Sequence, residues 1–171
     1  MYIEIKEIGP EGLSVSRSMK AFRLPLIGNE GVQVDTVHLN GELSRDQDGI
    51  SFAGLIETVA TLSCSRCLEE FSLPLELPFD LFYTTEPEGA GNAATRIDDD
   101  MVTRVHLDGA RIDLQSLLSE QVYLGLPLKP LCRPDCLGLC PRCGTNLNAG
   151  GCACAEERTE DPRLQVLKNL L

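Results

Sequence analysis

Eight cysteines fall in four close pairs, and their spacing is the strongest chemical signal in the sequence. One short turn can present two thiolates to one metal ion, so four pairs supply the ligands of two tetrahedral Cys₄ sites. We therefore predict two structural zinc sites whose ligands are Cys64, Cys67, Cys132, Cys136, Cys140, Cys143, Cys152 and Cys154.

Two of the pairs have the form of a zinc knuckle. In Cys140-Pro141-Arg142-Cys143-Gly144 a tight turn would point backbone N–H groups at the first sulfur, and Gly144 tolerates the positive φ that follows. Cys64-Ser65-Arg66-Cys67 is a second plausible knuckle, in which Arg66 could offset the negative charge of the site.

The spacing favours one grouping of the pairs without excluding another. The preferred sites are Cys64, Cys67, Cys132 and Cys136, and then Cys140, Cys143, Cys152 and Cys154. The second group closes a short loop that contains Gly150 and Gly151, so little chain entropy is lost. An interleaved arrangement, in which the second and fourth pairs share a metal, stays open.

Other cysteine chemistries and other catalytic groups have weaker support. A redox CxxC belongs at a helix N-terminus, whereas Cys64 and Cys67 link two strand patterns. An iron–sulfur cluster remains an alternative cofactor. The two histidines, His38 and His106, lie in strand-like segments with no nucleophile nearby, and no phosphate-binding loop is present. We predict that the protein is not an enzyme.

The composition is that of a soluble protein, with 43% hydrophobic and 24% charged residues among 171. The N-terminus lacks a basic stretch followed by an apolar run, and no segment has the length of a membrane span. We therefore expect a cytoplasmic location. In that compartment eight cysteines favour metal binding over disulfides.

The net charge of −11 lies in residues 1–130, which hold 10 basic and 21 acidic side chains; residues 131–171 hold five of each. Two zinc–Cys₄ sites would bring the charge to about −15. This charge disfavours coating of a phosphate backbone and suits a basic protein partner. The weaker candidates for nucleic-acid or partner contact are Arg17, Lys20, Arg23, Arg66, Arg133 and Arg142. For the first three, charge patterning favours a solvated loop or strand face.

Hydrophobic patterning indicates a sheet and one clear helix. Phe71 to Tyr83 places seven large apolar residues on one parity, and Pro74 and Pro78 on the other parity predict an edge position. Leu114 to about Leu124 carries an apolar stripe behind an Asp113 N-cap. Further strands are predicted at 2–8, at 31–43 with a bulge between Val34 and Val37, at 50–62 in the middle of the sheet, and at 101–107.

The predicted fold class is α+β, a mostly antiparallel sheet with one or two short helices and a cysteine-rich C-terminal segment. We divide the chain into a sheet domain at 1–130, which carries the Cys64/Cys67 knuckle, and a zinc-binding segment at 131–171 that packs on it. A mobile acidic loop is expected at 84–100, and a short terminal helix is expected from Asp161.

The motifs around the cysteines resemble those of the YceD family of large ribosomal RNA subunit accumulation proteins. The resemblance rests on the CxRCL sequence at Cys64–Leu68, on the run from Cys136 to Asn148, and on the closing Asp161-Pro162-Arg163-Leu164. It covers about residues 50 to 171. It implies a bacterial cytoplasmic factor that is needed for normal levels of 23S rRNA and has no established enzymatic activity.

The charge and the resemblance together suggest how such a factor could act. We expect it to bind a large-subunit ribosomal protein or a pre-ribosomal particle, with rRNA contact possible and with no membrane or small-molecule substrate. The competing hypotheses are a zinc-dependent RNA-binding module and a purely structural subunit of a larger assembly.

Overall fold

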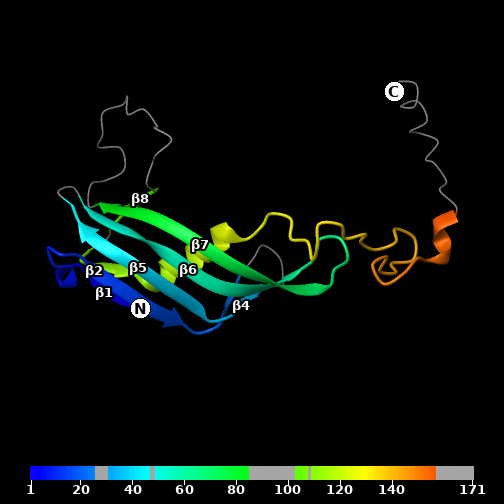
Figure 1. Cartoon of the computed structure of the whole chain (residues 1–171), viewed down its shortest axis with the longest axis horizontal. Helices are drawn as coiled ribbons and strands as arrows, with labels where there is room; N and C mark the ends of the chain where they lie inside the picture. The colour runs from blue at the N-terminus through cyan, green and yellow to red at the C-terminus, as the bar shows by residue number, and fades with distance from the viewer. Residues whose placement is uncertain (26–30, 47–48, 85–102, 108, 157–171) are drawn as a thin grey trace, which may run out of the picture. The chain divides into compact units, whose positions relative to one another are not determined.

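The computed structural model describes residues 1–25, 31–46, 49–84, 103–107 and 109–156. Strands predominate, and together with one α-helix they confirm the predicted α+β class (Figure 1). In chain order the elements are β1 (Tyr2–Glu4), the 3₁₀ helix η1 (Ile5–Glu7), β2 (Leu13–Met19), β3 (Phe22–Leu24), β4 (Val32–Val34), β5 (Val37–Arg45), β6 (Ile50–Ser63), β7 (Glu70–Thr84), β8 (Thr103–His106), β9 (Arg111–Asp113), α1 (Leu114–Gly125) and the 3₁₀ helix η2 (Ala153–Glu156).

The chain forms two compact units. Unit 1 comprises Met1–Leu62 and Ser72–Leu128, and unit 2 comprises Ser63–Phe71 and Lys129–Leu171. The sequence prediction drew a single boundary after residue 130. The division in the structure instead places the turn between β6 and β7, with its two cysteines, in the same unit as the C-terminal segment.

The sheet of unit 1 is built around β6, as predicted for the strand at 50–62. β5 and β4 pair antiparallel with successive parts of β6, and β7 pairs with it as well. The predicted bulge between Val34 and Val37 is instead a break between two strands. There the Thr58 hydroxyl donates to the carbonyls of Asp35 and Thr36, at 3.4 and 3.3 Å.

β7 shows the predicted alternation, with Leu75, Phe79, Leu81 and Tyr83 buried on one face. Its parallel pairing with β8 covers only Leu81–Thr84. The part of β7 that holds the two prolines therefore has only β6 as a partner among the described strands. This agrees with the predicted edge position, because proline cannot donate a ladder hydrogen bond.

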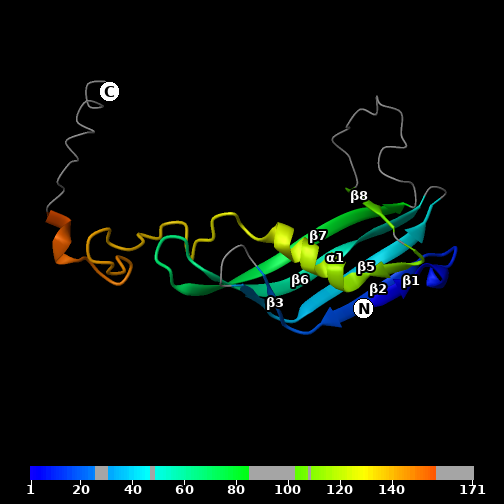
Figure 2. The same ribbon diagram turned by 180° about the vertical axis from the view of Figure 1, so that it is seen from behind.

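α1 begins and packs as the sequence predicted. The Asp113 carboxylate accepts a hydrogen bond from the Gln115 N–H at 2.9 Å, and the buried stripe is Leu114, Leu117, Leu118 and Val122. The helix lies over one face of the sheet (Figure 2), whereas no described helix of unit 1 covers the opposite, open face (Figure 1). The core includes an edge-to-face contact between Phe52 and Phe79, with ring centroids 5.0 Å apart.

The N-terminal prediction was too long and several short strands were missed. The strand predicted at 2–8 ends at Glu4, because its partner β9 offers only three residues, and η1 follows. β2 and β3 lie in a stretch read as loop or strand face, and β9 was not predicted. The acidic loop at 84–100 and the terminal helix fall outside the described residues, apart from Thr84. None of the described helices is long and apolar enough to cross a membrane.

Candidate metal centre

The first cysteine site joins the turn between β6 and β7 to the C-terminal segment, within unit 2. The Cys64 N–H donates to the Glu69 carbonyl at 2.9 Å, and the Leu68 N–H donates to the Cys64 carbonyl at 2.9 Å, which closes the turn. The Ser65 N–H donates to the Pro130 carbonyl at 2.8 Å. This last bond brings Cys132 and Cys136 beside the turn.

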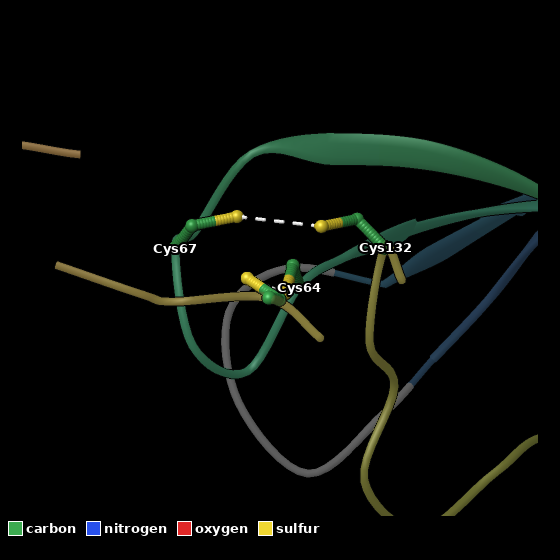
Figure 3. A group of neighbouring side chains, drawn as sticks. Cys64, Cys67 and Cys132 are labelled. Atoms are coloured by element: carbon green, nitrogen blue, oxygen red, sulfur yellow. Dashed lines mark hydrogen bonds between the residues drawn. The ribbon is translucent and has the colours of Figure 1, made fainter. Parts of the chain in front are cut away.

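The four sulfurs of this first site have the spacing of a tetrahedral metal site. Cys64 Sγ lies 3.7 Å from Cys136 Sγ, and Cys67 Sγ lies 3.7 Å from Cys132 Sγ (Figure 3). All four sulfurs lie within 4.8 Å of one another. Thiolates about 2.3 Å from a central ion occupy the corners of a tetrahedron about 3.8 Å apart, whereas a disulfide would bring two sulfurs to about 2.0 Å. The geometry therefore fits a single ion held by four thiolates.

The first site is closed and lies in its own small apolar core. Cys64, Cys67 and Cys136 are buried, and the side chains packed against them are Phe71, Leu131, Cys132 and Leu139. With all four corners taken by sulfur, no position remains for water or substrate. Such a site stabilises structure instead of carrying out chemistry.

Protein dipoles favour negative charge on some of these sulfurs. Burial raises the pKa of the Cys64 thiol, but backbone amides of Cys132, Cys67 and Arg66 outweigh it and lower the pKa to about 6. Burial and the neighbouring sulfurs raise the pKa of Cys132 to about 12. Four thiolates can therefore coexist here only around a cation, because without one the sulfurs repel one another.

The second site lies wholly in the C-terminal segment, where Cys140, Cys143, Cys152 and Cys154 bring their sulfurs within 4.8 Å of one another. It is more open than the first, since Cys143 is exposed and only Cys140 is buried. Hydrogen bonds from the Thr145 side chain and backbone lower the pKa of Cys143 to about 6, whereas contact with the Cys140 sulfur raises that of Cys152 to about 11.

The two CxxC turns share one backbone design. In the second site the Cys140 N–H donates to the Thr145 carbonyl and the Gly144 N–H donates to the Cys140 carbonyl, which repeats the pattern around Cys64. Gly144 has φ 72°, as predicted, and Leu68 occupies the equivalent position with φ 62°. A leucine is costly in this conformation, and the Leu68 side chain is 67% exposed.

Comparison with known proteins agrees with the cysteine motifs. Residues 52–171 match the family described as "Large ribosomal RNA subunit accumulation protein YceD". The chain belongs to this family.

Relatives of this YceD family protein occur in plants and mycobacteria. A chloroplastic protein of Zea mays, named large ribosomal RNA subunit accumulation protein YCED homolog 1, is 32% identical over 146 residues, which cover 72% of this chain and 47% of that protein. The Arabidopsis thaliana protein of the same name is 26% identical over 176 residues, covering 91% and 52%. An uncharacterized protein of Mycobacterium tuberculosis is 32% identical over 124 residues, covering 71% and 58%. The chain thus spans about half the length of these relatives, and no solved structure matches it.

The cysteines of this YceD family protein gather in the grouping that was preferred from their spacing. The six predicted contact residues are divided between the two units. Arg17, Lys20 and Arg23 belong to unit 1, in and between β2 and β3, and the other three belong to unit 2. His38 and His106 lie in strands β5 and β8, as expected.

Two of these arginines brace the cysteine-rich unit. The Arg66 guanidinium donates to the Cys136 carbonyl at 2.7 Å, so it ties the turn to the C-terminal segment. Arg133 donates to the Asn148 side-chain oxygen at 2.7 Å and lies 3.5 Å from the Asp135 carboxylate. Sequence reasoning missed the role of Asn148, whose Nδ2 donates to the Cys136 sulfur at 3.3 Å.

Proposed function

We propose that this YceD family protein is a non-enzymatic factor in the biogenesis of the large ribosomal subunit, needed for accumulation of 23S rRNA. In this proposal two zinc ions shape unit 2, and the protein acts by binding a basic ribosomal protein or an assembly intermediate in the cytoplasm. The observation that carries the proposal is the pair of closed Cys₄ groups within a family named for large ribosomal RNA accumulation.

The sulfur spacing supports a single ion at each site. Thiolates select zinc or iron among the common metals, and a tetrahedral set of four is typical of structural zinc. In a multi-iron cluster the thiolates bind different iron ions and stand farther apart. Sulfurs that all lie within 4.8 Å of one another favour one ion.

Charge supports a protein partner over naked RNA. The open face of the sheet carries exposed Glu42, Glu57, Glu76 and Asp80 on β5, β6 and β7. Two basic side chains in the same phase, Arg23 and Arg104, lie on the outer strands β3 and β8. A hollow of about 350 Å³ on this face is lined by polar side chains from β2, β5 and β6, namely Ser16, Arg17, Ser18, His38, Asn40 and Glu57, so it holds one carboxylate beside one guanidinium. Such a surface attracts lysine and arginine side chains and repels phosphates.

The alternative of a zinc-dependent RNA-binding module has weaker support. Arg66 and Arg133, the two basic side chains nearest the first site, already make hydrogen bonds within unit 2. They would have to leave these partners, or share them, to contact phosphate.

The test compares binding of the zinc-loaded chain to precursor large subunits and to protein-free 23S rRNA over a range of salt concentrations. We expect the chain to sediment with the particles and not with the free rRNA. Charge reversal on the open face, Glu57→Lys with Glu76→Lys, should weaken binding. Glu7→Lys with Glu11→Lys makes the same charge change at exposed positions in and after η1 and should not.

The opposite result would favour the RNA-binding module. It would be tight binding to free rRNA that weakens steeply with salt, with a slope reduced by Arg142→Gln and unchanged by the Glu57/Glu76 reversal.

A further inference from the structure

A side chain from the loop of the second cysteine site reaches a sulfur of the first. Asn148 lies between Cys143 and Cys152, in the loop that the second site closes. Its Nδ2 donates to Cys136 Sγ at 3.3 Å. Cys136 is a buried member of the first site, so the two sites share a hydrogen bond.

Three further side-chain contacts and one backbone contact hold Asn148 in one orientation. Its oxygen accepts from the Leu137 N–H at 2.8 Å and from Arg133 at 2.7 Å, and its Nδ2 also donates to Asn146 Oδ1, 2.9 Å away. The Asn148 N–H donates to the same Asn146 oxygen at 2.9 Å. If the amide were flipped, its oxygen would face the Cys136 thiolate, and its NH₂ group would face the Leu137 and Arg133 donors. Both contacts would be repulsive, so the NH₂ group has to face the sulfur.

The bond acts on the charge of the first site. An N–H donor stabilises a thiolate and offsets part of the net charge of a Cys₄ ion.

The position of Asn148 depends on its loop. The loop is held by the second site and by two backbone hydrogen bonds that form the bridge between Leu139 and Asn146. The Leu147 N–H donates to the Gly138 carbonyl at 2.9 Å, and the Cys140 N–H donates to the Thr145 carbonyl at 2.8 Å. After Asn148 come Ala149 and then the exposed Gly150 and Gly151, which leave the chain loosely restrained unless Cys152 is ligated.

We propose that Asn148 is a positioning residue that couples the two metal sites, so that metal at Cys140, Cys143, Cys152 and Cys154 tightens metal binding at Cys64, Cys67, Cys132 and Cys136. This inference rests on the metal binding in the proposed function. Because coupling is reciprocal, metal at the first site also tightens the second by the same factor.

The test is competition between the chain and a zinc chelator of known affinity, with ¹¹³Cd resonances to report each site separately. Asn148→Asp keeps the acceptor oxygens for Leu137 and Arg133 but loses the donor to sulfur, and Asn148→Ala loses both. We expect both to weaken the first site by about tenfold to a hundredfold, the range for contacts to a metal ligand. The cadmium resonance of the first site should shift. Asn40→Asp on β5 makes the same chemical change at a side chain that accepts a hydrogen bond from the Ser16 hydroxyl, and it should change neither site.

Removal of the second site tests the coupling itself. The double variant Cys152→Ser with Cys154→Ser should weaken metal binding at the first site. Adding Asn148→Asp to this double variant should reduce that affinity by a smaller factor than Asn148→Asp does in the intact chain. The coupling would be overturned if two metals bind tightly and metal affinity at the first site does not change when Asn148 is replaced or when the second site is removed. That result would leave the proposed function standing. A chain that binds no metal would overturn both.

Discussion

Replacing Gly138 with alanine tests how the first metal site is assembled. Gly138 has φ 78°, and a Cβ built there would lie 3.0 Å from the Arg66 carbonyl oxygen. That oxygen already accepts the Leu139 N–H at 3.1 Å, one of the bonds that join the turn to the C-terminal segment. The oxygen can move away only by weakening this bond.

The expected cost of Gly138→Ala is the sum of two effects. An alanine in this left-handed conformation costs about 1–2 kcal/mol. Displacing the Arg66 carbonyl costs about 1 kcal/mol more, the typical net value of one hydrogen bond. Metal binding is coupled to folding of the site, so a strain of about 2–3 kcal/mol weakens zinc binding at the first site by roughly 30-fold to 140-fold.

Gly144→Ala is the matched control. Gly144 has φ 72° but no atom within 4 Å of a built Cβ, so only the conformational cost applies, and it falls on the second site. Chelator competition on both variants measures the two effects. The reasoning would be refuted if Gly138→Ala binds metal at the first site as tightly as the wild type. It would also be refuted if its loss of affinity only equals the loss that Gly144→Ala causes at the second site, because the Arg66–Leu139 contact would then contribute nothing.

Three further predictions concern the metal sites and the core. Cys64→Ser should release one of two bound metals, measured by elemental analysis; release of both, or of neither, would contradict two separable sites. Burial and the nearby Glu120 carboxylate raise the pKa of Tyr83 above its ordinary value of 10.0. Tyr83 therefore ionises at a lower pH in the unfolded chain than in the folded one, and the folded state loses stability as the pH rises above about 10. Tyr83→Phe should therefore raise the midpoint of alkaline unfolding, followed by circular dichroism, and an unchanged midpoint would show that Tyr83 does not control it. Leu118→Ala, at a fully buried position of α1, should lower the free energy of unfolding in urea by about 2–5 kcal/mol. Leu124, on the same helix, is 74% exposed, so Leu124→Ala should lower it by less than about 0.5 kcal/mol. Equal losses would contradict the packing of α1.

The elements that could be predicted are those whose signal is local. β7 keeps its large apolar residues on one parity from Phe71 to Leu81, and α1 combines an Asp113 cap with a buried stripe. β2 carries serine at every second position, a weak pattern, and exists because Ser14 and Ser16 pair with β5 far along the chain. β1 likewise depends on a pairing with β9, near the start of α1, and no local pattern reveals its length.

The same contrast holds for the metal centre. The cysteine grouping could be predicted, because ligand chemistry and loop closure restrict the choices. The role of Asn148 could not, since an asparagine in a Gly- and Asn-rich loop is usually explained by a turn. The positive φ of Leu68 could not be predicted either, because leucine rarely adopts this conformation. The one available signal was that Leu68 follows its CxxC motif at the same position as Gly144 follows the other.

The most direct test of the central claim is the metal content and absorption spectrum of protein purified without oxygen. Two zinc ions per chain and no visible absorption are the predicted result. Iron with visible charge-transfer bands would contradict the zinc sites, and a metal-free chain whose cysteines readily form disulfides would contradict metal binding altogether.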